Sequence, residues 1–166
     1  MRPEPGPRLT ERIIGLAMNV HRAIGPGLLE AVYQRCLAVE FGQAGLGFER
    51  EVPLELNYNG VRFPSAYKAD FIVERSVLLE LKSIEQIHPV HEAQTRTYLR
   101  LSGCDLALLM NFNTVLLKDG LRRFIASAAA LPPTQCKPPP INRRSPEHAA
   151  QSPGENVPAR SSPDMG

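Results

Sequence analysis

The sequence has no hydrophobic run that approaches the ~18 residues needed to cross a membrane. Its first ten residues, MRPEPGPRLT, contain no apolar core of a secretory signal. It has only three cysteines, Cys36, Cys104 and Cys136, and none of them stands in a C-x-x-C pair. These absences argue against a disulfide framework and against a structural zinc site. We therefore expect no membrane association and a location in the reducing cytoplasm.

The chain also lacks an excess of one charge. Its 19 Lys and Arg residues are balanced by 17 Asp and Glu residues, and residues 9–131 contain 13 of each kind. The small basic surplus lies outside that range. This balance excludes a strongly basic protein that coats nucleic acid, although it leaves room for a local binding groove.

Prolines and aromatic residues divide the chain into three parts. Three prolines precede Leu9, nine of the 16 follow residue 131, and all ten aromatic residues lie between Tyr33 and Phe124. A segment rich in proline, serine and charge but without aromatics cannot bury enough apolar area to offset the entropy lost on ordering. We predict a disordered leader over 1–8, one folded domain over 9–131 and a Pro-rich disordered tail over 132–166.

Helical periodicity marks three segments. Thr10 can cap a first helix, which Gly25-Pro26-Gly27 ends. A second helix is predicted over 28–41, and Pro89 opens a third, which Gly103 closes. The apolar positions expected to be buried are Ile13, Ala17, Val20 and Ile24 in the first helix, and Leu29, Val32, Tyr33, Cys36, Leu37 and Phe41 in the second.

Alternating apolar and polar residues predict strands between and after these helices. Pro53 argues that the first strand lies at a sheet edge or is bulged there, and Asn59-Gly60 is a strong hairpin signal. The order of elements predicts an α/β fold, with a mixed β-sheet flanked by helices. The predicted strands are 51–58, 61–63, 67–73, 77–84, 106–112 and 115–118, followed by a closing segment over 121–130 with helical character at its end.

The second predicted hairpin brings charged residues together. If residues 74–76 form a three-residue loop, Asp70 lies opposite Glu80 and Lys68 lies opposite Lys82. Asp70, Glu80 and Lys82 then project from one face, because strand side chains alternate. Two carboxylates so close repel each other unless a cation or a shared proton lies between them. Oxygen ligands without His or Cys nearby suit Mg²⁺ or Mn²⁺.

These motifs resemble a known superfamily. Asp70 followed by Glu80-Leu81-Lys82 is similar to the motif of the PD-(D/E)xK nucleases, with Ala69 at the proline position. The segment Gly27-Leu28-Leu29-Glu30-Ala31-Val32-Tyr33 resembles the signature of the GxxExxY family, which is assigned to that superfamily. The resemblance covers about 10–125 and implies a restriction-endonuclease-like fold. Further similar segments are 90–94, Tyr98-Leu99, Gly103 and Asn111-Phe112.

The resemblance also implies roles for individual residues. Asp70 and Glu80 would hold Mg²⁺ or Mn²⁺, and Glu30 would supply a further ligand directly or through water. Lys82 would orient or activate the attacking water and help to neutralise the transition state. The implied reaction is hydrolysis of a DNA phosphodiester. Gln94 and Tyr98 resemble the Q-x-x-x-Y motif beside the metal site of recombination exonucleases, with Gln94 as a catalytic candidate and Tyr98, Arg96 and Arg100 as candidates for substrate binding.

Structural explanations remain open for several of these residues. The charged hairpin residues are also consistent with an exposed cluster, and Glu30 with stabilisation of a helix N-terminus. His88 and His91 flank a helix start, so we expect surface or supporting roles for them rather than zinc binding. Tyr33 is expected in packing. Arg96 and Arg100 could contact phosphate, but an exposed basic edge is the commoner explanation for them.

Two alternatives to a DNA nuclease follow from the same residues. One is a catalytically inactive module for binding or scaffolding, which the neutral domain favours because phosphate contacts supply most non-specific DNA affinity. The other is a metal-dependent hydrolase of a small phosphorylated substrate. A homodimer is compatible with cutting both DNA strands, and the sequence identifies no protein partner.

Overall fold

The computed structural model describes residues 7–126, which form three α-helices, one 3₁₀ helix and five strands. The predicted disordered tail and residues 1–6 of the predicted leader lie outside these residues. In chain order the elements are α1 (Pro7–Ile24), α2 (Glu30–Gln43), β1 (Phe48–Tyr58), β2 (Val61–Val73), β3 (Val77–Lys82), α3 (Pro89–Ser102), β4 (Leu106–Asn111), η1 (Leu117–Gly120) and β5 (Leu121–Ile125).

The strands form one mixed sheet in the order β1-β2-β3-β4-β5. Neighbouring strands are antiparallel except β3 and β4, which are parallel and are joined by the crossover through α3. A parallel pair needs such a crossover, because the chain must return to the starting end of the sheet. The predicted α/β fold with a mixed sheet flanked by helices is confirmed.

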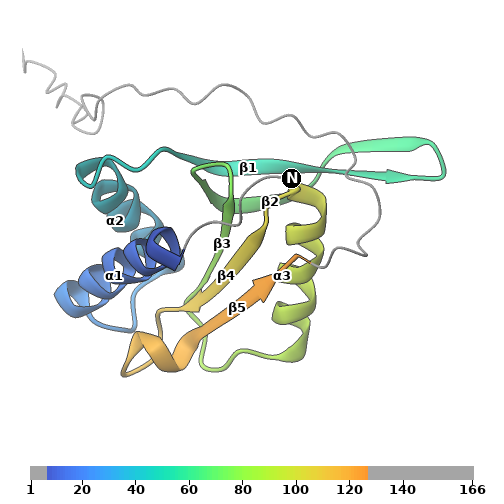
Figure 1. The fold of residues 1–166 in the computed structure, drawn as a ribbon. Coiled ribbons are helices and arrows are strands. Elements are labelled where there is room, and N and C mark those ends of the chain that lie inside the picture. Colours follow the sequence, from blue (N-terminus) through green and yellow to red (C-terminus); the bar gives the residue numbers. More distant parts are fainter. Residues whose placement is uncertain (1–6, 127–166) are drawn as a thin grey trace, which may run out of the picture.

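Helices cover both faces of this sheet (Figure 1). The first core lies between the sheet and the pair α1 and α2, where Tyr33 and Leu37 pack with Leu79 and Leu81. The second core lies between the sheet and α3, where Tyr98 packs with Leu78 and its neighbours. Adjacent residues of β3 therefore alternate between the two cores, and a polar residue at one of these positions is buried by the helix facing it.

The first helix corrects one sequence prediction. Helix α1 begins at Pro7, so Thr10 lies inside the first turns of the helix, where it is buried, and does not cap it. Proline is well suited to a helix start because it has no N–H to leave unpaired. Ile13, Ala17 and Val20 are buried as predicted, whereas Ile24 at the end of the helix is 36% exposed.

The second helix begins later than predicted, at Glu30. Leu29 and Val32 are exposed, which corrects their assignment to the buried stripe, and Cys36 is half-buried. The preceding loop contains Gly25 and Gly27, both with positive φ. It leaves Leu29 outside the helix, so the buried face is narrower than a stripe that starts at residue 29. That face consists of Tyr33, Leu37 and Phe41.

The first hairpin matches its sequence signals. Asn59 and Gly60 both have positive φ, as a two-residue turn of this type requires. The strand that contains Pro53 is the sheet edge, and its ladder with β2 shifts register between Leu54 and Leu56. The predicted strands 61–63 and 67–73 are one continuous strand, β2, because this irregularity bends the ladder without ending it.

The segment after β4 differs from the prediction. Residues 115–118 do not form a strand: Val115 and Leu116 are exposed, and only Leu117 is buried, at the start of η1. The closing segment at 121–125 is strand β5, which pairs with β4. The helical character predicted near residue 130 lies outside the described residues.

Candidate metal-binding and active site

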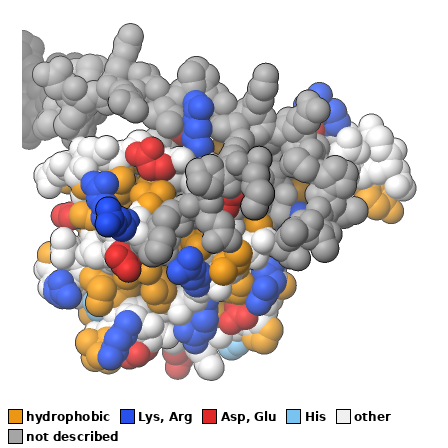
Figure 2. All heavy atoms as spheres, in the orientation of Figure 1, with side chains coloured by type: hydrophobic (Ala, Val, Ile, Leu, Met, Phe, Trp, Pro, Cys, Tyr) orange, Lys and Arg blue, Asp and Glu red, His pale blue; other side chains and the backbone are white. Residues whose placement is uncertain are grey.

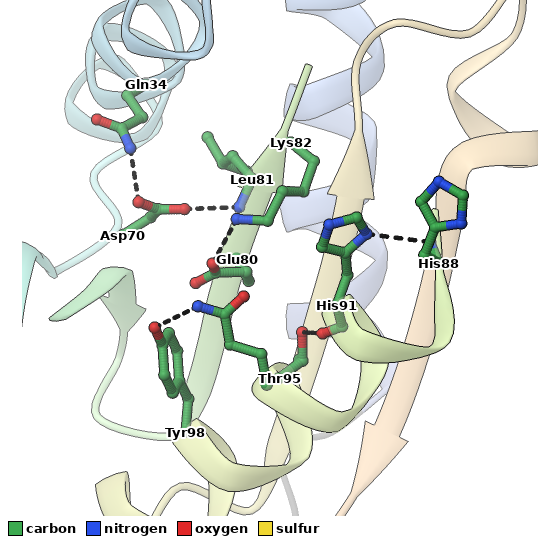
Figure 3. Close-up of polar contacts among 10 residues, drawn as sticks. Gln34, Asp70, Glu80, Leu81, Lys82, His88, His91, Thr95 and Tyr98 are labelled. Carbon is green, nitrogen blue, oxygen red and sulfur yellow. Dashed lines mark hydrogen bonds and ion pairs between the residues drawn. The ribbon is translucent and has the colours of Figure 1, made fainter. Parts of the chain in front are cut away.

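The site is built where β2 separates from β3. The second hairpin has the predicted register, with Val73 opposite Val77, but the pairing ends at Phe71 and Leu79. The next residue, Asp70, directs its carboxylate at β3, and Oδ2 accepts the N–H of Leu81 at 2.7 Å (Figure 3). A side-chain oxygen thus takes the place of a backbone acceptor. Asp70 and Glu80 are neighbours across this split, not members of a regular strand pair.

Glu80 enters the site from the α3 face. Its neighbours Leu79 and Leu81 pack in the α1–α2 core, so Glu80 points to the opposite side of the sheet and is only 4% exposed. Lys82, two residues further along, lies on the same face and donates from Nζ to Oε1 of Glu80 at 2.7 Å. Oε2 of Glu80 is buried and has no hydrogen-bond partner among residues 7–126.

Helix α2 reaches the same point from the other side of the sheet. Nε2 of Gln34 donates to Oδ1 of Asp70 at 2.6 Å, so both oxygens of that carboxylate are held by protein donors. Glu30 lies one turn earlier on α2, and its charge acts on Asp70, Glu80 and Lys82. Side chains of α2 on one face of the sheet and of α3 on the other, such as Gln34 and Tyr98, therefore converge at the split between β2 and β3 (Figure 3).

Buried contacts position the start of α2. The ring of Tyr33 stacks on Phe112 with centroids 4.5 Å apart. Its hydroxyl donates to the carbonyl of Gly25 at 2.8 Å and accepts the N–H of Leu28 at 3.1 Å. The hydroxyl of Ser83 donates to the Leu28 carbonyl at 2.5 Å. Tyr33 has the packing role expected of it, and these contacts fix the loop that leads into Glu30.

The predicted facing of Lys68 and Lys82 is wrong. Lys68 pairs with Pro53 in β1, and its ammonium donates to Glu51 at 2.8 Å on the exposed surface. The separation of β2 from β3 places Lys68 beyond the shared ladder. Lys82 is therefore the ammonium that contacts the buried Glu80 carboxylate, and the charge of the half-buried Asp70 also acts on it.

Burial and like charges disfavour ionisation of both carboxylates. Burial raises the pKa of Asp70 to about 6; the Leu81 N–H opposes this rise and the charge of Glu30 adds to it. Burial and then the charge of Asp70 raise the pKa of Glu80 to about 7, against the pull of Lys82. Burial by itself would lower the pKa of Lys82, but its bond to Glu80 and the three surrounding acids raise it. The cluster holds more negative charge than one ammonium offsets.

The Q-x-x-x-Y pair lies on α3 beside this cluster. Nε2 of Gln94 donates to the hydroxyl of Tyr98 at 2.6 Å. Tyr98 is buried, which raises the pKa of its hydroxyl, and the charges of Glu80 and Lys82 also act on it. Its ring lies 5.2 Å from that of Tyr67 in β2. The structure thus brings Gln94 and Tyr98 close to Glu80, where they line the α3 side of the site.

The two arginines of α3 do not join the site. The guanidinium of Arg96 lies 4.5 Å from the centroid of Phe124 in β5. That position is on the flank of α3 away from Tyr98, because residues two apart on a helix point in different directions. Arg100 is exposed, one turn after Arg96. Neither arginine contacts the carboxylate cluster, so a role in substrate binding at the cluster itself is not supported by their positions.

His88 and His91 act at the start of α3. The N–H of His88 donates to Nδ1 of His91 at 3.0 Å, and the rings lie 5.7 Å apart. A side chain that accepts this N–H stabilises the helix N-terminus in the manner of a capping box. The supporting role expected for the two histidines fits this contact.

Gln34 is the site residue that the sequence prediction missed. It follows Glu30 by four residues, which places both side chains on the same face of α2. That spacing was the available signal, since a polar residue one turn from a candidate ligand can reach the same group. The signal alone does not reveal that Asp70 is its partner.

The chain matches a known family. Residues 7–124 match the family model described as the PD-(D/E)XK nuclease superfamily, and the chain belongs to this superfamily. The five-stranded mixed sheet with three helices is consistent with its restriction-endonuclease-like α/β fold. No curated protein and no solved structure matches the chain.

Members of the superfamily typically use divalent metal ions. Among residues 7–126, no group of three or more His, Cys, Asp and Glu side chains is placed to hold an ion. Two carboxylates nevertheless fit Mg²⁺, which is usually bound through one or two carboxylates, with water and substrate phosphate completing its shell. The buried, unpartnered Oε2 of Glu80 is the observation that favours this fit.

Within residues 7–126, no helix has the length and apolar character needed to cross a membrane.

Proposed function

We propose that this protein hydrolyses phosphodiester bonds of DNA with the help of Mg²⁺ or Mn²⁺. The observation that carries the proposal is the split between β2 and β3, where the half-buried carboxylate of Asp70, the buried carboxylate of Glu80 and the ammonium of Lys82 meet. Glu80 contributes a buried oxygen, Oε2, that accepts no hydrogen bond from the described part of the chain. Such an arrangement costs stability unless a ligand compensates for it, and costly clusters of titratable groups concentrate at functional sites.

Each residue of the site would have a separate role in the reaction. Asp70 and Glu80 would hold the ion, with Glu30 as a further ligand directly or through water. When bound, a divalent ion polarises a phosphoryl oxygen and makes water more acidic. Lys82 keeps a positive charge beside the carboxylates, so it can orient water and offset the charge that develops on the phosphoryl oxygens. Gln94, held by Tyr98, would orient groups on the α3 side.

The finer family assignment also belongs to the proposal. The segment from Gly27 to Tyr33 resembles the GxxExxY signature, and the surroundings of two of its residues support this assignment. Tyr33 fixes the loop before α2, and Glu30 supplies charge to the cluster. This division supports the interpretation that the signature marks a candidate metal ligand and its structural anchor.

The mixed distribution of surface charges is also consistent with the inactive binding module. On the face shown in Figure 2, basic and acidic side chains are interspersed and do not form one broad basic surface. Nonspecific affinity for DNA depends on the number of phosphates that cations neutralise. A nuclease of this kind would therefore bind DNA weakly and gain specificity from the geometry at the cluster.

The test is cleavage of supercoiled plasmid, single-stranded DNA and RNA with Mg²⁺ or Mn²⁺, by the native chain and by Lys82→Met. Lys118→Met removes an ammonium from an exposed position and is the matched control. We expect ion-dependent cleavage of DNA that falls about 10²- to 10⁴-fold in Lys82→Met, the range for loss of a catalytic group, and persists in the control. Equal background rates for all three proteins would support the inactive module instead. Turnover of small phosphate esters without any DNA cleavage would support the small-substrate hydrolase.

A further inference from the structure

The outer part of the β1–β2 hairpin projects from the body of the sheet (Figure 1). We call residues 55–67 the arm. Strand β3 pairs with β2 only between Phe71 and Val73, and residues 61–68 are all exposed. Within the described part of the chain, the outer edge of the arm therefore has no strand partner.

One face of the arm is apolar. Leu56 lies opposite Phe63, and Tyr58 lies opposite Val61, so these side chains share a face of the two-stranded ribbon. Leu56 packs against the core beneath α3, which identifies the face as the α3 side. Figure 2 shows hydrophobic side chains on the underside of the projecting arm.

The exposed aromatic residues gather on this face. Tyr58 is 65% exposed, Phe63 46% and Tyr67 38%, and among the described residues these are the large exposed aromatics. Tyr67 lies at the root of the arm, opposite Leu54, and contacts Tyr98. The aromatic face, Tyr58, Phe63 and Tyr67, thus runs from the tip of the arm to the α3 side of the carboxylate site.

The charges of the arm do not suit a nucleic acid. Arg62 donates two hydrogen bonds to the carboxylate of Glu55, at 2.9 and 2.6 Å. At the root, Lys68 is paired with Glu51. Phosphate contacts need cations that are free to pair with phosphate, and here each cation already has an acidic partner. Recognition on this face must depend on apolar and aromatic contact.

The size of the face does not suit a stable dimer. The exposed parts of Tyr58, Val61, Phe63 and Tyr67 amount to about 400 Å², if a whole side chain offers roughly 150–250 Å². A specific interface between two proteins buries about 800 Å² on each partner. A patch of this size can still hold a segment that is tethered to it, because the tether supplies a high effective concentration.

We propose that the proline-rich segment 132–140 of this same chain, PPTQCKPPP, docks on the aromatic face of the arm. Five of its nine residues are proline, and the sequence after residue 126 contains no aromatic residue. Proline-rich segments favour the extended polyproline conformation, which binds surfaces lined with aromatic side chains at little entropic cost. The arm supplies the aromatic residues and the tail supplies the prolines.

The end of the described chain places this segment within reach. The N–H of Ala126 donates to the carbonyl of Asp105 at 2.9 Å. The neighbouring Cys104 packs in the same core as Leu54 and Tyr98, at the root of the arm. From residue 126 to residue 140 the chain can extend up to ~50 Å. Docking of the tail does not depend on whether the carboxylates hydrolyse DNA.

The test uses Cys136, which lies within the segment, as the attachment point for a nitroxide spin label on the full chain. Cys36→Ser and Cys104→Ala leave it as the single thiol. We expect the label to broaden the backbone amide signals of residues 56–63 more than those of the rest of the domain. The broadening should disappear in Phe63→Ser and persist in Arg62→Ser, which changes the opposite face of the arm. Uniform or absent broadening, or broadening unchanged by Phe63→Ser, would overturn the proposal.

Two further measurements identify other occupants. In the first, chain that carries the spin label but no ¹⁵N is mixed with ¹⁵N-labelled chain that carries no spin label. Broadening in this mixture would assign the face to a second copy and refute the proposal. Oligonucleotide binding that Phe63→Ser abolishes, without any contact from the label, would assign it to nucleic acid and also refute it. If the cysteine replacements unfold the protein, hydrogen exchange of the unmodified chain is compared with Pro138→Ser/Pro139→Ser/Pro140→Ser. Docking requires faster exchange in residues 56–63 of that variant, and equal exchange contradicts it.

Discussion

The carboxylate of Asp70 accepts a hydrogen bond from the N–H of Leu81 at the residue where the pairing of β2 with β3 ends. One side chain therefore ends a strand ladder and opens a gap in the sheet. Through that gap Gln34 reaches Asp70 from one face, while Glu80 and Lys82 approach from the other. The gap brings Gln34 into the site, because an intact ladder would keep this side chain of α2 on the opposite side of the sheet from Glu80 and Lys82.

The stability of the metal-free protein should fall as the pH rises from about 4 to about 7. The pKa of Asp70 is raised from 3.8 to about 6 and that of Glu80 from 4.5 to about 7, so the folded state binds more protons than the unfolded state in this range. Their contribution is complete below the unfolded values and is lost as the pH passes through the folded values. The loss should be a few kcal/mol, because each tenfold difference in proton affinity between the two states corresponds to roughly 1.4 kcal/mol.

Urea unfolding in EDTA at pH 5 and pH 8 measures this effect. Glu80→Gln should show a smaller loss of stability between the two pH values than the native chain. Glu11→Gln changes an exposed residue of α1 and should follow the native chain. A native chain that is more stable at pH 8 than at pH 5 would contradict the assigned direction.

Gln34→Leu should reduce cleavage about 10- to 100-fold, the usual cost of removing a residue that orients a metal ligand. Without the amide, Oδ1 of Asp70 loses its donor, and the pKa of Asp70 should rise further. The limb of the pH–rate profile that reports this carboxylate should therefore move to higher pH. Arg35→Ala alters the adjacent exposed residue and should leave both the rate and the profile unchanged. A slower enzyme with an unmoved profile would indicate a merely structural role.

Tyr98→Phe should destabilise the fold by about 0.5–1.5 kcal/mol, the net value of one hydrogen bond. The hydroxyl accepts a hydrogen bond from the side-chain amide of Gln94. Tyr98→Phe should therefore reduce cleavage as well, but by less than Gln94→Leu does. Chemical unfolding and cleavage rates of the two variants provide the comparison. If Tyr98→Phe is the more damaging of the two for cleavage, the hydroxyl itself contacts the substrate.

Gly120→Ala should destabilise the protein by about 1–3 kcal/mol or more, the cost of overpacking. A Cβ at this position would lie 2.4 Å from the carbonyl oxygen of Asn111, which is backbone and cannot rotate away. Gly15→Ala is the matched control, because its Cβ meets nothing within 4 Å in the middle of α1. There the change should stabilise the protein by up to about 1 kcal/mol. Thermal unfolding of the two variants gives the comparison, and equal effects would refute this packing at Gly120.

Local signals made much of the fold predictable. Asn59-Gly60 marked a hairpin, Pro53 marked an edge, and Gly103 ended the third helix with a positive φ. The errors arose where tertiary packing decides the structure. Val115 has strand propensity, but it is 87% exposed and does not lie in a strand.

The sequence indicated that the charged residues of the second hairpin lie together, but not how they are arranged. The register from Val73 and Val77 follows from loop length, and it correctly places Asp70 near Glu80. Sequence periodicity assumes that the ladder continues, so it could not show that the Asp70 side chain ends it. For the same reason it set Lys68 opposite Lys82 and did not find Gln34, whose partner lies across the sheet.

The central claim is that the carboxylates at the split bind a divalent ion. Isothermal titration calorimetry of Mn²⁺ into the metal-free native chain, Asp70→Asn and Glu11→Gln at pH 7.5 tests it most directly. We predict binding to the native chain and to Glu11→Gln, and a loss of binding in Asp70→Asn. Equal binding by all three proteins, or none by the native chain, would contradict it.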